Sequence, residues 1–127
     1  MTKKNHAQWK DRPEKTDYQA ALDYLSLEFT AATAKSFVAQ ARRARCIERI
    51  AKDLLRASHL PLLPAEEMHV AEDLKRIHKR KRISPIILVQ GDLMKNRPCI
   101  IADGYHRLCA ACHADEDAVV AMVLVSP

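Results

Sequence analysis

The chain has 127 residues, a formal net charge of +5 at pH 7 and 48% hydrophobic residues. This length suits one globular domain and leaves little room for a second one. No apolar run approaches the roughly 20 residues of a membrane-spanning helix, and the charged N-terminus lacks the apolar core of a signal peptide. We therefore expect a cytoplasmic protein without a membrane partner, whose four cysteines are free thiols.

The first half of the chain is polar at its start and then helical in pattern. Residues 1–15 are mostly polar or charged, which predicts a flexible N-terminal arm. A Thr-x-x-Gln capping box at Thr16 and a second N-cap at Thr30 each precede apolar residues at helical spacing. The same period resumes at Ile47 and continues for about three turns. We therefore predict a helical N-terminal extension over residues 16–58.

Residues 59–127 change character and alternate between strand-like and helix-like segments. The proline-bracketed segment LPLLP suits an edge strand. The elements expected after it are a helix striped by Val70, Leu74 and Ile77, a strand over 85–90, a hairpin loop from Gly91, a strand over 99–102, a helix over 105–113 and a strand over 119–125. This order predicts an α/β fold of the α+β kind, with helices packed on a small mixed sheet.

The stretch PCIIADGYHRLCAA, residues 98–111, carries the strongest indication of a binding site. Its apolar run meets Asp103 and Gly104, and a helix then begins with a tyrosine, a histidine and an arginine. Glycine permits a positive φ or a close backbone approach. A helix N-terminus offers unpaired N–H groups and the positive end of the helix dipole. We therefore expect an anion-binding corner there.

The order of these elements, together with the motif IIADGYHRLCAA, resembles the ParB/sulfiredoxin-like superfamily over residues 59–127. Its members include CTP-binding chromosome-partitioning proteins, sulfiredoxins that use ATP, and free-serine kinases. The resemblance implies a domain that binds a nucleotide or phosphorylated small molecule. It also implies a nucleoside triphosphate with Mg²⁺ as the cofactor.

The resemblance assigns roles to individual residues of the turn. The expected ligand-binding residues are Ser84, Gly104, Tyr105, His106 and Arg107. If the chain is an enzyme, Asp103, His106 and Arg107 are the expected catalytic residues, and the reaction is nucleotide hydrolysis or phosphoryl transfer. Asp103 and Tyr105 can equally be a turn former and a packing aromatic. Sulfiredoxins have their reactive cysteine where this chain has Tyr105, so we do not expect sulfiredoxin activity.

A second interpretation starts from the basic run KRIHKRKR over residues 75–82. It can be a solvated helix end, or it can attract an anionic partner. The alternative function is therefore a non-catalytic DNA-associated or protein-interaction module. Its expected nucleic-acid contacts are Lys79, Arg80, Lys81 and Arg82. A homodimer is also an open alternative.

The remaining cysteine and histidine pattern is not expected to hold a cofactor. Cys109, Cys112 and His113 match the Cys-x-x-Cys-His pattern of haem attachment, but they lie on a predicted helix of a protein without an export signal. No fourth zinc ligand accompanies them in the sequence. We expect no haem, no structural zinc and no protein-held metal site.

Overall fold

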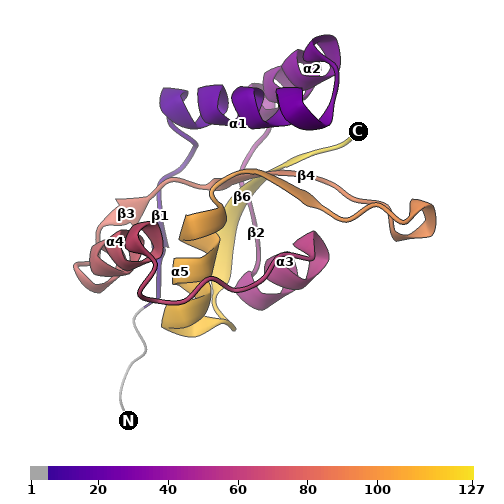
Figure 1. Cartoon of the computed structure of the whole chain (residues 1–127). Helices are drawn as coiled ribbons and strands as arrows, with labels where there is room; N and C mark the ends of the chain where they lie inside the picture. Colours follow the sequence, from indigo (N-terminus) through magenta and orange to yellow (C-terminus); the bar gives the residue numbers. More distant parts are fainter. Residues whose placement is uncertain (1–5) are drawn as a thin grey trace.

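The computed structural model describes residues 6–127, which form an α+β fold around a four-stranded mixed sheet (Figure 1). The strand order is β2-β6-β4-β5, where β4 and β6 are parallel and the other neighbours are antiparallel. The strands are β2 (Ile47–Ile50), β4 (Ile86–Val89), β5 (Ile100–Asp103) and β6 (Val119–Val125). The expected fold class, helices packed on a small mixed sheet, is confirmed.

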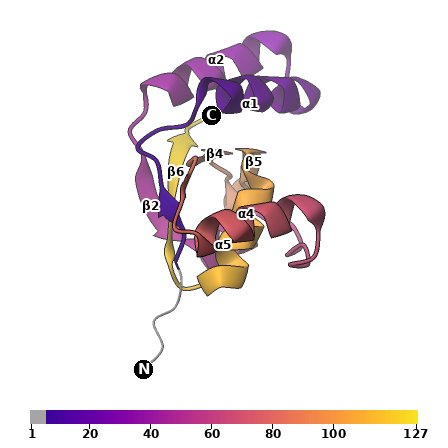
Figure 2. The same ribbon diagram turned by 90° about the vertical axis from the view of Figure 1, so that its left-hand side faces the viewer.

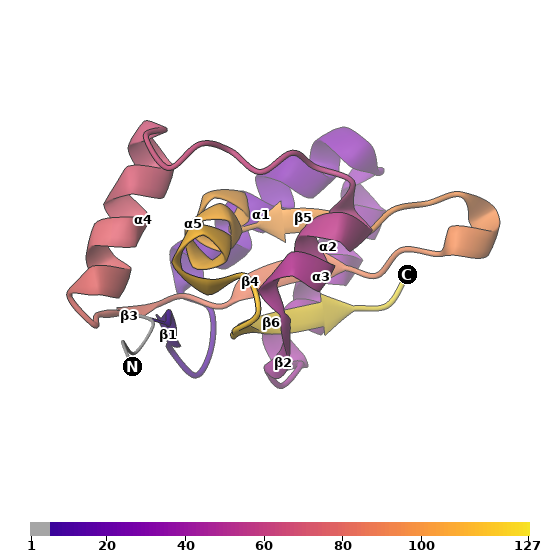
Figure 3. The ribbon, with the colours of Figure 1, turned by 90° about the horizontal axis from the view of Figure 1, so that it is seen from below.

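Helices cover both faces of this sheet. Helices α1 (Lys15–Glu28) and α2 (Ala31–Arg43) lie on one face, as Figure 2 shows most clearly. Helices α3 (Ala51–Ser58) and α5 (Tyr105–Asp115) lie on the other, and α4 (Met68–His78) packs beside α5 (Figure 3). The strands β1 (Gln8–Trp9) and β3 (Arg82–Ile83) form a separate two-stranded parallel sheet beside α4.

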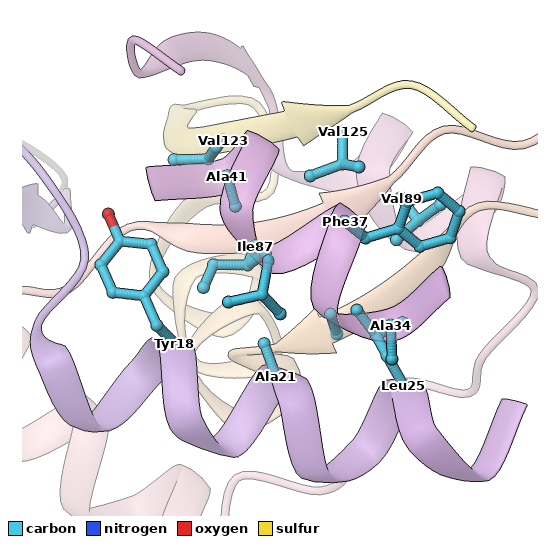
Figure 4. Close-up of a cluster of buried hydrophobic side chains, with 12 residues drawn as sticks. Tyr18, Ala21, Leu25, Ala34, Phe37, Ala41, Ile87, Val89, Val123 and Val125 are labelled. Atoms are coloured by element: carbon cyan, nitrogen blue, oxygen red, sulfur yellow. The ribbon is translucent and has the colours of Figure 1, made fainter. Parts of the chain in front are cut away.

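Strand β4 is fully buried because its alternating side chains face two different cores. Ile87 and Val89 join the cluster under α1 and α2, which includes Leu25 and Phe37 (Figure 4). Ile86 and Leu88 face α3 and α5 instead. A strand buried on both faces is expected to be a continuous apolar run, and IILV is one.

The segment 47–50 is a strand, and the prediction of one helical extension over 16–58 is wrong there. Ile47–Ile50 pairs with β6, so β2 is one of the two edge strands of the main sheet. Ile47 and Ile50 are three residues apart, which fits a helical period. In the structure they are instead the first and last residues of β2, and α3 begins directly after them. The backbone hydrogen bonds offered by β6 decide between these states, and they are not visible in a local pattern.

Two further local predictions need correction. The segment LPLLP is not a strand, since its prolines cannot donate to a ladder. Side chains of α5 hold it instead: the Tyr105 hydroxyl donates to the Pro61 carbonyl, and His113 Nε2 lies 2.7 Å from the Leu63 carbonyl. Helix α1 begins at Lys15, one residue before Thr16, and the Asp17 carboxylate accepts from the Glu14 N–H.

The expected arm over residues 1–15 is structured where it is described. Gln8–Trp9 pairs with β3, and Trp9 packs against the clusters on both sides of α5. Residues 1–5 lie outside the described residues. The second N-cap is confirmed, since the Thr30 hydroxyl accepts from the Thr33 N–H at 3.3 Å. Within residues 6–127, no helix combines the length and apolar composition needed to cross a bilayer.

Helix α1 is part of the core, which a pair of leucines on this helix can test. Leu25 is fully buried, whereas Leu27 is 84% exposed. Leu25→Ala should lower the free energy of unfolding by about 2–5 kcal/mol, because it leaves a cavity under the sheet. Urea titration measures this change. Leu27→Ala is the matched control and should change stability by less than about 0.5 kcal/mol; equal effects would mean that α1 does not pack as described.

Candidate functional site

The site is built on the turn between β5 and α5. Gly104 has φ +105°, in the left-handed region, which confirms that this glycine is needed for the backbone. A Cβ there would lie 2.9 Å from Arg107 Nη2 and 3.0 Å from Ile86 Cγ1. The turn therefore depends on glycine twice, for its dihedral angle and for the close approach of two side chains.

Arg107 is mostly buried, at 18% exposure, and its guanidinium is bound within the protein. Nε donates to the Ser84 carbonyl at 2.9 Å, and Nη2 donates to Asp103 Oδ2 at 2.8 Å and to the Pro85 carbonyl at 3.4 Å. Asp17 of α1 lies 3.8 Å from the same nitrogen. Arg107 thus ties the turn to α1 and to the segment before β4. Ser84 contributes its backbone carbonyl to this contact.

Asp103 shares the Arg107 guanidinium with Asp17, and its pKa reflects mainly its burial. Burial raises the pKa of the Asp103 carboxyl from 3.8 to about 6; Arg107 opposes the rise and Asp17 adds to it. A carboxyl group with a pKa near 6 exchanges a proton close to neutral pH, as general acids and bases do. Asp103 is therefore chemically distinct from a surface aspartate.

His106 faces helix α4. Its ring lies 4.9 Å from the ring of His69, and its Nε2 lies 3.9 Å from Glu67 Oε2. Glu67 is the N-cap of α4, and the hydrogen bond that it accepts from the Val70 N–H lowers its pKa, with smaller contributions from the two histidines. Two imidazoles and one ionised carboxylate therefore meet where α4 and α5 begin.

A cavity of about 290 Å³ opens between the turn and α4. It is lined by Asp103, Gly104, His106 and Arg107 from the turn, and by His69, Glu72, Asp73 and Arg76 from α4. The first N–H groups of α5 have no partner within the helix, and they lie at this end. Three of the expected ligand-binding residues, Gly104, His106 and Arg107, are thus brought together around one cavity.

The other expected binding residues lie nearby but not in this lining. Ser84 lines a second cavity of about 330 Å³, which also includes Asp73, Arg76 and Arg107. Tyr105 turns away toward the Pro61 carbonyl. Lys10, Glu14, Asp17 and Arg82 complete the polar lining of the second cavity. The two cavities therefore lie on either side of the same arginines.

Sequence reasoning missed the contribution of α4 and α1 to this site. His69 and Arg76 lie about 30 residues before the turn, and Asp17 lies further away still. Their spacing in the sequence carries no motif. Only the packing of α4 against α5, and of α1 against β5, brings them to the turn.

The basic run lies at the end of α4 and the start of β3. Lys79, Arg80, Lys81 and Arg82 are all exposed, and Arg82 also borders the second cavity. In the part of the chain that the structure describes, no carboxylate pairs with these four side chains. The charges therefore face solvent.

The cysteines of α5 are buried in the packing of the helix. Cys109 and Cys112 are both buried, and burial raises the pKa of Cys112 to about 12. A thiol with so high a pKa is a poor nucleophile at neutral pH. Over residues 6–127, no group of three or more His, Cys, Asp or Glu side chains is arranged to hold a metal ion.

Comparisons with the models of known protein families, with curated proteins and with solved structures found no match. Function is therefore inferred from the geometry of the turn and from its motif. The geometry places helix N–H groups, two imidazoles and the Arg76 guanidinium around one small polar cavity, together with the carboxyl groups of Glu72, Asp73 and Asp103. The N–H groups, imidazoles and guanidinium are donors of the kind that bind anions.

The Asp103 environment predicts a pH dependence of stability. Its pKa is higher in the folded chain than its ordinary value of 3.8, so the folded state binds this proton more tightly than the unfolded state does. Stability from this group is present at low pH and is lost as the pH rises from about 4 to about 6, by an amount on the order of 1–3 kcal/mol. Urea unfolding at a series of pH values should show this fall.

Asp103→Asn should remove that fall, whereas Asp53→Asn on the exposed side of α3 should keep it. The carboxyl ¹³C shift of Asp103 should titrate with a midpoint near 6. A midpoint at or below about 4, the ordinary value for aspartate, would contradict the described environment.

Proposed function

We propose that this chain binds a nucleotide or another phosphorylated small molecule at the turn 103–107. The observation that carries the proposal is the cavity of about 290 Å³ in which the start of α5, His106 and four α4 side chains converge, among them His69 and Arg76. Phosphate binding at a helix N-terminus uses N–H groups that the helix itself leaves unpaired. The start of α5 at this turn supplies such N–H groups.

The proposed phosphate contacts come from His106, His69 and Arg76. Arg76 keeps one edge of its guanidinium on Asp73, with Nη1 2.6 Å from Oδ1, and the rest of the group is half exposed beside the cavity. The two imidazoles can each donate a hydrogen bond to an anion. In this proposal Arg107 is a positioning residue, because its guanidinium already serves Ser84 and Asp103.

The two cavities favour a ligand longer than inorganic phosphate. Their volumes, about 290 and 330 Å³, are each at the low end for small-molecule sites, and they share Asp73, Arg76 and Arg107. A nucleoside triphosphate with Mg²⁺ would extend along both. Carboxylate oxygens, which Mg²⁺ prefers, are offered by Glu72 and Asp103 beside the proposed phosphate position.

If the site is catalytic, the reaction proposed is nucleotide hydrolysis or phosphoryl transfer. Asp103, with its pKa near 6, is the group able to take or give a proton, and His106 would stabilise the charge that develops on phosphate. The resemblance of the motif to the ParB/sulfiredoxin-like superfamily supports the same class of ligand. Membership of that superfamily and a cytoplasmic location are parts of this proposal. Sulfiredoxin activity is not, because Tyr105 stands where the thiol would be needed.

Calorimetry tests the binding. ATP, CTP and GTP with Mg²⁺ should be titrated into the wild type, His106→Ala and Arg76→Ala. Each substitution should weaken binding about tenfold or more, because a charge-assisted hydrogen bond contributes about 1.5–3 kcal/mol. His78→Ala is the matched control, since this exposed histidine ends the same helix as Arg76 outside the lining of the cavity.

The proposal would be overturned if none of the three nucleotides, nor pyrophosphate, bound to the folded wild type. It would equally be overturned if both alanine variants bound as tightly as the wild type. Arg107→Ala is less informative, because removal of its internal hydrogen bonds should also lower stability.

A second candidate function is binding of nucleic acid by the basic run. The observation that favours it is the exposure of Lys79, Arg80, Lys81 and Arg82 without carboxylate partners among residues 6–127. Unpaired cations on one surface attract a phosphate backbone whatever its sequence. This function needs no catalytic turn, and it includes the alternative of a DNA-associated interaction module.

Salt dependence separates the two candidates. Binding of duplex DNA through this run should weaken steeply as salt rises, because condensed counterions are released. Replacing Lys79–Arg82 with alanine should reduce the slope of log K against log salt by about 1 for each phosphate that the chain no longer neutralises. Fluorescence anisotropy measures both slopes. Lys35→Ala, on an exposed position of α2, should leave the slope unchanged; the same slope in both variants would rule out the basic run.

A further inference from the structure

The loop between β4 and β5 is a projecting arm with a fixed shape (Figures 1 and 3). Asp92 accepts from the Met94 N–H at 3.0 Å and pairs with Arg97 in an isolated bridge, which closes the loop. Asn96 adopts a left-handed conformation with φ 55°. A Cβ on Gly91 would lie 2.5 Å from the Arg97 carbonyl oxygen, so the two sides of the loop touch there. These contacts within the loop hold the arm in a defined conformation.

This arm presents two apolar side chains at its tip. Leu93 and Met94, in the short 3₁₀ turn η1 (Leu93–Lys95), are 85% and 95% exposed. They are the most exposed large apolar side chains among the described residues. Burying a leucine or methionine side chain typically gains about 1.5–3 kcal/mol, so each offers binding free energy to a partner.

An apolar cavity of about 380 Å³ lies at the base of the same arm. It is lined mainly by apolar side chains: Tyr24, Phe29, Leu60, Pro98, Ile100 and Ile101. Tyr24 and Leu60 are themselves partly exposed. The cavity therefore accepts aliphatic groups, and its size falls within the range of small-ligand sites.

We propose that the arm docks a second copy of this chain, with the tip of each arm in the basal cavity of the other. Tip and cavity lie at opposite ends of one arm, so two arms placed side by side and antiparallel bring each tip to the other's base. A two-fold axis then relates the two contacts, and the assembly is a closed dimer. This proposal does not depend on the phosphate site.

One pair of opposite charges lies beside the two contacts. Lys95 follows Met94 at the tip and is exposed, and Glu28 of α1 lines the basal cavity together with Arg97 of the arm. Within its own chain, Glu28 accepts a hydrogen bond from the Tyr24 hydroxyl at 3.2 Å. In the proposed dimer, Lys95 of each copy approaches Glu28 of the other, which fixes the antiparallel arrangement.

Sedimentation equilibrium tests the assembly. The wild type should show a monomer–dimer equilibrium, and Leu93→Ser/Met94→Ser should be monomeric at every concentration while keeping the urea midpoint of the wild type. Met68→Ser and Val119→Ser are the matched controls, because these apolar residues are exposed elsewhere and should leave dimerisation unchanged. A wild type that stays monomeric, including one that binds lipid vesicles as a monomer, would overturn the proposal. So would a tip variant that still dimerises.

The arrangement of the two copies has its own test. Lys95→Glu and Glu28→Lys should each weaken the dimer several-fold, and the double reversal should restore it. In a Cys46→Ser/Cys99→Ser background, Met94→Cys mixed with Leu60→Cys should form an intermolecular disulfide under mild oxidation. Failure of both the charge rescue and the cross-link, in a protein that dimerises, would overturn the tip-to-base arrangement.

Discussion

The buried guanidinium of Arg107 is the interaction on which the candidate site depends. It joins three segments far apart in the sequence: α1 through Asp17, the start of β4 through the Ser84 carbonyl, and β5 through Asp103. A buried charge without these partners would be strongly unfavourable, so the three segments are held together. This arrangement also favours glycine at position 104, because a Cβ there would lie 2.9 Å from Arg107 Nη2.

The same contacts give the histidine and the arginine of the turn different environments. A Gly-x-His-Arg motif suggests that histidine and arginine both face a ligand, but here the arginine is engaged inside the protein. Besides Asp103 and Arg107, the side chains that line the cavity are His106 and the α4 residues His69, Glu72, Asp73 and Arg76. Asp103, held between Arg107 and Asp17, keeps a raised pKa as a consequence of the same burial. Arg107 is thus held by contacts within the protein, whereas the proposed ligand contacts come from other residues.

The two proposed binding regions lie at opposite ends of β5. The turn with Gly104 follows its last residue, and the projecting arm with Leu93 and Met94 precedes its first (Figure 3). The helices before residue 58 serve both ends, since Asp17 of α1 reaches the turn while Tyr24 and Phe29 line the basal cavity of the arm. The N-terminal helices therefore contribute residues to both regions.

The sequence by itself determined the elements with strong local signals. The apolar runs of β4 and β6, the stripe of α4, the Thr30 cap and the glycine at the turn were all predictable, because each depends on neighbouring residues. It did not determine that Ile47–Ile50 is a strand or that LPLLP is not, because backbone partners on β6 and side chains of α5 decide those states. It also could not show that Arg107 is bound internally or that His69 meets His106, because both facts arise from packing between distant segments. The local sequence thus predicted the turn, and the tertiary structure decided which of its side chains are bound within the protein and which line the cavity.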